Sequence, residues 1–115
     1  MALILLVEDD ESVRTTTAEM MRELGHEVVD ADSAEAAMPL LHEMQVDVLV
    51  TDVGLPGTSG EVFAAEARVV RPGMRVIFVT GGDSIADRTA DGSSPILLRK
   101  PFDLDALDIA LGPAV

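Results

Sequence analysis

The chain has 115 residues, 48% of them hydrophobic, so one domain with a substantial core is expected rather than a disordered segment. The absence of cysteine excludes disulfides, thiolate metal sites and thiol catalysis, and the absence of a signal peptide or a long apolar run predicts a cytoplasmic protein with no membrane association. With 21 acidic and 8 basic residues, the formal net charge of −13 argues against direct nucleic-acid binding and favours partners that carry positive charge, divalent cations among them.

Continuous apolar runs alternate along the chain with segments of helical period. In chain order the sequence predicts a strand at Leu3–Val7, a helix at Asp10–Leu24, a strand at Glu27–Ala31, a helix at Ser33–Met44, a strand at Val46–Val50, a helix at Ser59–Val70, a strand at Val76–Val79, a short helix at Asp83–Ala90, a strand at Pro95–Lys100 and a short helix at Asp103–Leu111. Gly25 is expected to end the first helix, while Ser33 and Asp103 are expected N-caps. Pro39 should kink or split the second helix.

The five strand–helix units contain no repeat and no linker. They predict an α/β fold with a doubly wound, five-stranded parallel sheet, covered on both faces by five helices in a three-layer arrangement. One domain is expected over residues 1–115, with no effector domain after it. In sheets of this kind ligands bind at the carboxyl ends of the strands, so a functional site is expected there.

Polar residues with complementary chemistry stand at these strand ends. They are Glu8, Asp9 and Asp10 after the first strand, Thr51 and Asp52 after the third, Thr80 after the fourth and Lys100 after the fifth. Asp10 and Glu11 are explained by the start of a helix, where the helix dipole favours acidic side chains. Glu8 still belongs to the strand, so it is assigned with Asp9 to a cation site.

These residues have the chemistry needed to bind Mg²⁺ and to accept a phosphoryl group. Carboxylate oxygens of Glu8, Asp9 and Asp52 suit Mg²⁺, a hard cation that takes few protein ligands and keeps several waters. A carboxylate beside Mg²⁺ can act as a nucleophile, which would convert Asp52 into an aspartyl phosphate. The metal and the Lys100 ammonium would neutralise charge on the transferred group, and the Thr80 hydroxyl can donate a hydrogen bond to it.

Four segments, "LLVEDD", "LVTDVGLPGTSG", "IFVTGG" and "LLRKPF", occur in this order along the chain. In this order and spacing they resemble the response-regulator receiver domains of two-component signalling, the CheY-like family. The resemblance covers essentially the whole chain. It implies strand order 2-1-3-4-5 and a domain that is phosphorylated by a sensor histidine kinase or a histidine phosphotransfer domain. The output is altered binding of an unknown downstream protein, so the domain is not an enzyme in the usual sense.

The family's site roles map onto individual residues of this chain. The resemblance implies that Asp52 is phosphorylated and that Asp9 binds Mg²⁺ directly, with Glu8 acting through water. The backbone carbonyl of Gly54 corresponds to a further metal ligand. Thr80 corresponds to the hydroxyl that moves on activation, and Lys100 to the lysine that pairs with phosphate.

The chain departs from the family pattern at the residues that transmit the signal. Receivers commonly carry an aromatic residue on the last strand, where this chain has Leu97, so any switch must act through Thr80 and movement of loops or helices. The Lys100–Pro101 bond is often cis in the family and is counted with the switch. The output face is expected to comprise the helix at Asp83–Ala90, the last strand and the last helix.

Three alternatives remain open at this point. The same module occurs in hybrid sensor kinases, and a degenerate receiver would dock constitutively without phosphorylation. An Mg²⁺-dependent phosphohydrolase with an aspartyl nucleophile is less favoured, because such enzymes carry Asp-x-Asp after the first strand. His26 and His42 have no partner at metal-binding spacing and are interpreted as surface residues.

Overall fold

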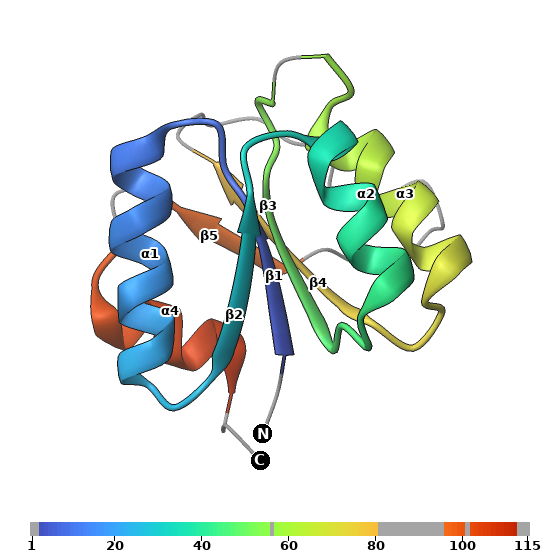
Figure 1. Ribbon diagram of the computed structural model, residues 1–115. Helices are drawn as coiled ribbons and strands as arrows, with labels where there is room; N and C mark the ends of the chain where they lie inside the picture. The colour runs from blue at the N-terminus through green and yellow to red at the C-terminus, as the bar shows by residue number, and fades with distance from the viewer. Residues whose placement is uncertain (1–2, 56, 81–95, 101, 113–115) are drawn as a thin grey trace.

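A computed structural model describes residues 3–55, 57–80, 96–100 and 102–112 (Figure 1). Its elements in chain order are β1 (Leu3–Val7), α1 (Glu11–Glu23), β2 (Glu27–Ala31), α2 (Ala34–Glu43), β3 (Val48–Asp52), α3 (Gly60–Val70), β4 (Arg75–Thr80), β5 (Ile96–Arg99) and α4 (Leu104–Leu111). The helix predicted at Asp83–Ala90 lies outside the described residues, so α4 corresponds to the predicted last helix.

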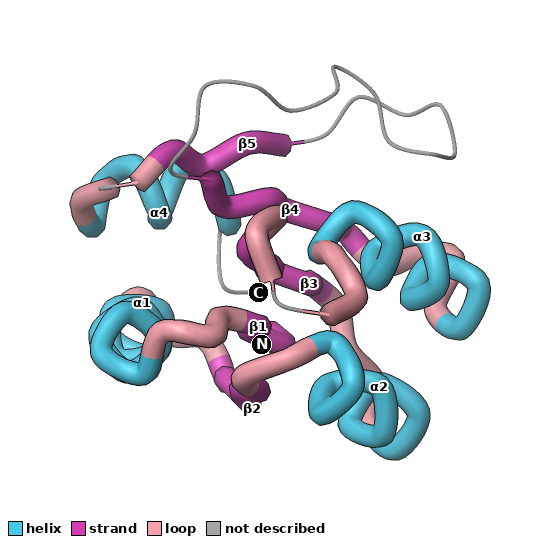
Figure 2. The backbone as a smooth tube through the Cα atoms, turned by 90° about the horizontal axis from the view of Figure 1, so that it is seen from above, coloured by secondary structure: helices cyan, strands magenta, loops and turns pink. Residues whose placement is uncertain are grey.

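The five strands form one parallel sheet in the order β2-β1-β3-β4-β5, which confirms the predicted fold. Helices α1 and α4 cover one face of the sheet, and α2 and α3 cover the other (Figures 1 and 2). The crossovers between parallel strands therefore build the three expected layers.

Strand alternation divides the apolar residues between two cores. Leu5 and Val7 of β1 pack on the α2 and α3 side, whereas Ile4 and Leu6 pack on the α1 and α4 side. All four are at most 2% exposed, which explains why β1 is a continuous apolar run rather than an alternating one. Each buried side chain of this size contributes about 1.5–3 kcal/mol relative to its exposed state.

Each described helix starts with a side-chain cap on the backbone. Asp10, Ser33, Ser59 and Asp103 accept a hydrogen bond from the backbone N–H three residues later, at 2.9, 3.0, 3.3 and 2.8 Å respectively. A cap of this kind stabilises a helix by about 1 kcal/mol. The N-caps predicted at Ser33 and Asp103 are confirmed, and Asp10 caps α1 as its position at a helix start indicated.

Two local predictions need correction. The third strand begins at Val48 and extends to Asp52, because its register with β4 continues to the pair Asp52–Val79. Helix α2 is continuous from Ala34 to Glu43, so Pro39 does not split it, and the kink expected there stays a prediction. Pro39 is exposed and removes only the N–H that would bond to the carbonyl of the residue four positions earlier, a loss that packing of the buried α2 face offsets.

His26 is buried, with 5% of its surface exposed, so its interpretation as a surface residue is wrong. The cause is the end of α1, where Gly25 has a φ of 96° and its N–H donates to the Arg22 carbonyl. The N–H of His26 donates to the Met21 carbonyl, which completes the Schellman motif and turns His26 back against the helix. His42 is exposed, as predicted.

Candidate functional site

Glu8 and Asp52 lie next to each other because of the parallel register of β1 and β3. Val7 pairs with Thr51 across these strands, so the residues that follow meet at the same carboxyl edge of the sheet. The residues two positions before Glu8 and Asp52 belong to the core on the α1 and α4 side. Strand alternation therefore directs both carboxylates toward that face.

Lys100 reaches the two carboxylates from the end of β5. Its Nζ donates to Asp52 Oδ2 at 2.8 Å and forms a short ion pair with Glu8 Oε1. The Lys100 backbone N–H donates to the Thr80 carbonyl at 2.8 Å, which anchors the lysine beside the end of β4. One ammonium thus joins two acids that are far apart in sequence, an arrangement that requires the folded sheet.

Asp9 completes an acidic cluster at this edge. Glu8, Asp9 and Asp52 each offer one carboxylate oxygen, and these three atoms lie within 4.8 Å of one another. Glu8 is buried, Asp52 half-buried and Asp9 exposed, so the cluster opens to solvent on one side. Three carboxylates with the ammonium of Lys100 leave a surplus of negative charge. Their hard oxygen atoms fit Mg²⁺, which binds few carboxylates and retains waters.

The two oxygens of Asp52 have different partners. Oδ2 accepts from Lys100, while Oδ1 accepts from the backbone N–H of Gly54 at 2.8 Å. These bonds fix the carboxylate plane before any ligand arrives. The Gly54 N–H thus contacts the carboxylate of the nucleophile candidate, while the metal-binding role of its carbonyl stays a prediction.

Burial and the bonds to neighbouring groups shift the pKa values of Glu8, Asp52 and Lys100 in opposite directions. Burial raises the pKa of Glu8 to about 7, against the lowering effect of Lys100. Burial would also raise the pKa of Asp52, but hydrogen bonds from Lys100 and Gly54 outweigh it and the pKa lies below its usual value. Burial would lower the pKa of Lys100, yet its bonds to both acids raise the pKa instead. Lys100 is thus held as a cation.

Thr80 and Leu97 are the predicted switch residues that the structure describes. Thr80 is buried at the end of β4, and Leu97 on β5 is 47% exposed. Leu97 pairs with Phe78 and Arg99 pairs with Thr80, so alternation places Leu97 and Thr80 on the same face of the sheet. Pro101 lies outside the described residues.

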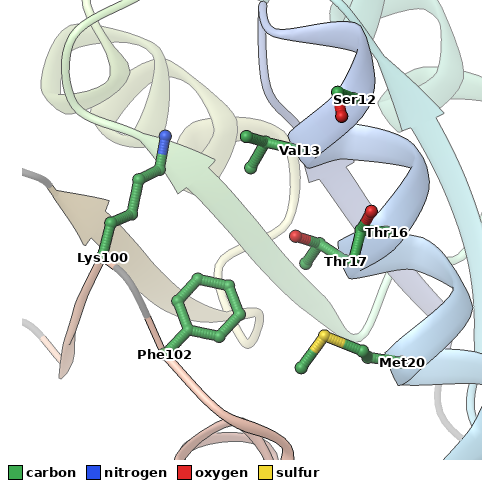
Figure 3. A pocket seen from close by; sticks show the side chains of 7 residues that line it. All are labelled: Ser12, Val13, Thr16, Thr17, Met20, Lys100 and Phe102. Carbon is green, nitrogen blue, oxygen red and sulfur yellow. The ribbon is translucent and has the colours of Figure 1, made fainter.

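A cavity of about 440 Å³ adjoins Lys100 between α1 and the segment after β5 (Figure 3). Its lining residues are Ser12, Val13, Thr16, Thr17, Met20, Lys100 and Phe102. A smaller recess shares Val13, Thr17 and Phe102 with this cavity and extends to Glu8 and Asp52.

Sequence reasoning missed this cavity, although two signals were present: the inward spacing of Val13, Thr17 and Met20, and the Phe102 of "LLRKPF". Gly60 was also missed. A Cβ built on it would lie 2.1 Å from the carbonyl oxygen of Asp52, a contact that no local pattern reports.

The fold and the site together define a doubly wound α/β protein with an acidic, lysine-containing site at the carboxyl edge of its sheet. Residues 4–111 match the family model of the response regulator receiver domain. The chain belongs to this family. Among the described residues, no helix is long and apolar enough to cross a membrane.

Named relatives show the contexts in which such domains occur. The chain is 34% identical over 110 residues to the response regulator protein FleR of Pseudomonas aeruginosa, covering 92% of this chain and 23% of FleR. It is 31% identical over 107 residues to the response regulator receiver protein CpdR of Brucella abortus, covering 90% of this chain and 88% of CpdR. It also resembles the crystal structure of the receiver domain from the hybrid histidine kinase CckA, with a TM-score of 0.82 and 29% identity over 96% of this chain and 95% of that one.

The share of each relative that is covered differs widely. The chain spans between 22% and 26% of the length of FleR and of two transcriptional regulators that it matches. It spans most of CpdR. Receiver domains of this kind therefore occur both within larger regulators and as the main part of a chain.

Proposed function

We propose that this chain is a phosphoacceptor domain in which Asp52 receives a phosphoryl group. The observation that supports this most directly is the immobilised Asp52 carboxylate, held by Lys100 on one oxygen and by the Gly54 N–H on the other, beside two further acids. An oxygen of Asp52 forms the new P–O bond, and the P–N bond of a phosphohistidine donor breaks. The electron pair of that bond leaves with the imidazole, which takes up a proton.

Each neighbouring residue has a defined part in this proposal. Asp9 and Glu8, with the Gly54 carbonyl, would hold Mg²⁺, which supplies charge neutralisation for the incoming phosphoryl oxygens. Lys100 contributes a positive charge that the raised pKa maintains at neutral pH. The hydroxyl of Thr80, at the next strand end, is assigned to the phosphoryl group after transfer.

The partners follow from the same chemistry. The phosphodonor is a sensor histidine kinase or a histidine phosphotransfer domain in the cytoplasm, and the cavity beside Lys100 lies on the α1 side from which such a donor can approach. Phosphorylation would alter the surface that includes β5 and α4, where Leu97 and Ile109 are exposed, and change binding of a downstream protein.

A receiver within a hybrid sensor kinase is the second candidate. It is favoured by the structural match to the CckA receiver, which covers 95% of that domain. Both candidates use the same phosphoacceptor chemistry and differ in the protein that supplies the phosphoryl group.

Incubation with acetyl phosphate and Mg²⁺, followed by intact-mass measurement, tests the proposal. We expect a mass increase of one phosphoryl group, absent in Asp52→Ala and absent when EDTA removes the metal. Asp105→Asn, at an exposed acid on α4, is the matched control and should be phosphorylated normally. An unmodified wild-type protein would contradict the proposal and support a degenerate receiver that docks without phosphorylation.

A further inference from the structure

The loop between β3 and α3 is attached to a different element, the start of α2. Thr58 near the end of this loop donates its hydroxyl to Glu35 Oε2 at 2.8 Å, and its backbone N–H lies 3.4 Å from the same oxygen. The two residues are 23 positions apart in sequence. A charged acceptor with a hydroxyl donor makes a stronger hydrogen bond than a neutral pair does.

The turn at Gly57 lies close to the same carboxylate. Gly57 has a φ of 74°, a conformation that favours glycine. The two carboxylate oxygens of Glu35 lie 3.5 and 3.6 Å from the position that a Cβ of Gly57 would occupy. Glu35 therefore lies beside Gly57 as well as bonding to Thr58, and a side chain at position 57 would have a strained backbone and would be in van der Waals contact with Glu35.

The loop carries the main groups of the proposed site at its other end. Asp52 precedes it directly, and Gly54 both bonds to the Asp52 carboxylate and supplies the carbonyl assigned to the metal. The base of the loop is closed where the N–H of Gly60 donates to the Val53 carbonyl at 3.3 Å. Because Val53 is bonded to Gly60 and Thr58 is bonded to Glu35, both ends of this loop are held, which restrains Gly54 beside Asp52.

The α2 side of this contact is itself rigid. Ser33, two residues before Glu35, caps the start of α2, and the neighbours Ala34 and Ala37 are at most 3% exposed. Glu35 is exposed, and the hydroxyl of Thr58 holds the pKa of its carboxyl below the usual value. Glu35 is thus ionised at neutral pH and anchored to a fixed helix start.

We propose that Glu35 is a positioning residue for the phosphorylation site: through Thr58 it holds the β3–α3 loop so that Gly54 and Asp52 present their oxygens to Mg²⁺ in one arrangement. This inference rests on the proposed function and adds to it a residue outside the acidic cluster. Without the contact, the loop must be ordered when the metal binds, and that cost appears as weaker affinity.

Four variants separate the contact from general effects of charge. Thr58→Val keeps the branched shape but removes the hydroxyl, and Glu35→Ala removes the acceptor. Glu35→Gln retains an acceptor oxygen without the charge. Glu66→Ala is the matched control, because Glu66 is an exposed acid that lines the same small cavity as Glu35 and Thr58.

The first readout is backbone amide exchange in the metal-free protein, followed by NMR, and the second is the dissociation constant for Mg²⁺ from calorimetry. We expect faster exchange at Thr58 and about three- to tenfold weaker Mg²⁺ binding in Glu35→Ala and Thr58→Val, the range that loss of one such hydrogen bond produces. Glu35→Gln should fall between these variants and wild type. The double variant should be no weaker than either single variant, since both remove one contact.

The inference is overturned if Glu35→Ala or Thr58→Val binds Mg²⁺ as wild type does, if the two effects add in full, or if Glu66→Ala weakens binding equally. Acetyl phosphate labelling of the same samples distinguishes the two proposals. If acetyl phosphate labels the wild-type protein but the Glu35 and Thr58 variants bind Mg²⁺ as tightly as wild type, only the positioning role of Glu35 is rejected. If the variants bind Mg²⁺ more weakly but acetyl phosphate does not label the wild-type protein, the proposed function is rejected and the positioning role of Glu35 stands. A wild-type protein that binds no Mg²⁺ removes both.

Discussion

Gly60, the first residue of α3, lies close to the end of β3. A Cβ on Gly60 would lie 2.1 Å from the Asp52 carbonyl oxygen and 3.0 Å from Val53 Cα, and both are main-chain atoms that cannot rotate away. The sequence shows only that this loop is rich in glycine. The structure shows that this particular glycine sets the distance between the helix and the strand end that carries Asp52.

Gly60→Ala is therefore expected to lower the free energy of unfolding by about 1–3 kcal/mol or more, since overpacking against backbone forces it to shift. The measurement is urea denaturation followed by circular dichroism, because the chain has no Trp or Tyr to report by fluorescence. Gly73→Ala is the control: nothing lies within 4 Å of its Cβ position, so this variant should be neutral or slightly more stable. Equal stability of both variants would contradict the expected collision.

Glu8 makes stability depend on pH in the metal-free protein. Burial raises its pKa from 4.5 to about 7, so the folded state binds a proton more tightly than the unfolded state. The resulting penalty is fully present above about pH 7, decreases as pH falls toward 4.5 and is absent below it. The lowered pKa of Asp52 has the opposite effect, and its contribution is lost only in more acidic solution.

We expect Glu8→Gln to stabilise the metal-free protein at pH 8 by about 1–3 kcal/mol, because a neutral amide avoids the cost of the buried charge. The gain should shrink as pH falls and vanish well below pH 4.5, where Glu8 is protonated in both states. Denaturation midpoints with EDTA at several pH values provide the measurement. A difference between the variants that does not change with pH would show that Glu8 titrates normally.

At the scale of elements, α4 depends on a residue of another element for its C-terminal cap. The helix has no basic residue in its last turn, and Arg75 of β4 donates to the carbonyls of Leu111 at 2.7 Å and of Ala110 at 3.0 Å. Arg71 similarly donates to the Met44 carbonyl at the end of α2. Arg75 thus joins the end of α4 to the sheet, whereas Arg71, the C-cap residue of α3, joins the end of α2 to the end of α3.

Arg75→Met is expected to cost about 1–2 kcal/mol of stability, from the loss of two charge-assisted hydrogen bonds and of a favourable interaction with the helix dipole. Amide exchange in the last turn of α4 should become faster. Arg75→Lys keeps the charge but loses the two-pronged geometry, and it should give an intermediate result. If Arg75→Met matches wild type by both measurements, the cap does not stabilise α4.

At the scale of the whole molecule, a formal charge of −13 opposes compaction, and Glu8, Asp9 and Asp52 bring three carboxylates together at the proposed metal site. A cation can reduce the repulsion among these acids in two ways. Any salt screens the charges in general, whereas binding to Glu8, Asp9 and Asp52 together requires the native state. Only the binding effect depends on the residues of the cluster, so a substitution there separates it from screening.

We expect Mg²⁺ to stabilise the protein beyond NaCl of equal ionic strength, by about 1.4 kcal/mol at about ten times its dissociation constant. Asp9→Asn should lose this increment and keep the response to NaCl. Asp105→Asn, which removes one exposed acid elsewhere, should retain both responses. Thermal unfolding followed by circular dichroism gives the comparison, and a full Mg²⁺ increment in Asp9→Asn would place binding elsewhere.

The sequence by itself determined the elements and their order. Apolar runs specify strands that are covered on both faces, and the caps at Ser33 and Asp103 act within one helical turn, so both are visible locally. The strand-end acids and Lys100 were identified because parallel strands bring their carboxyl ends to one edge. Strands and caps depend on residues close in sequence, and the position of the site depends on the parallel order of the strands. Neither depends on how individual side chains pack.

Only the tertiary structure decided which distant groups touch. The ion pairs of Lys100 with Glu8 and Asp52, the contact of Thr58 with Glu35 and the close approach of Gly60 all join separate elements. Their energies depend on register, on the angle of a helix against the sheet and on burial, which no short window of sequence contains. The burial of His26 was missed for the same reason: a polar residue next to a helix end faces inward only when the turn directs it there.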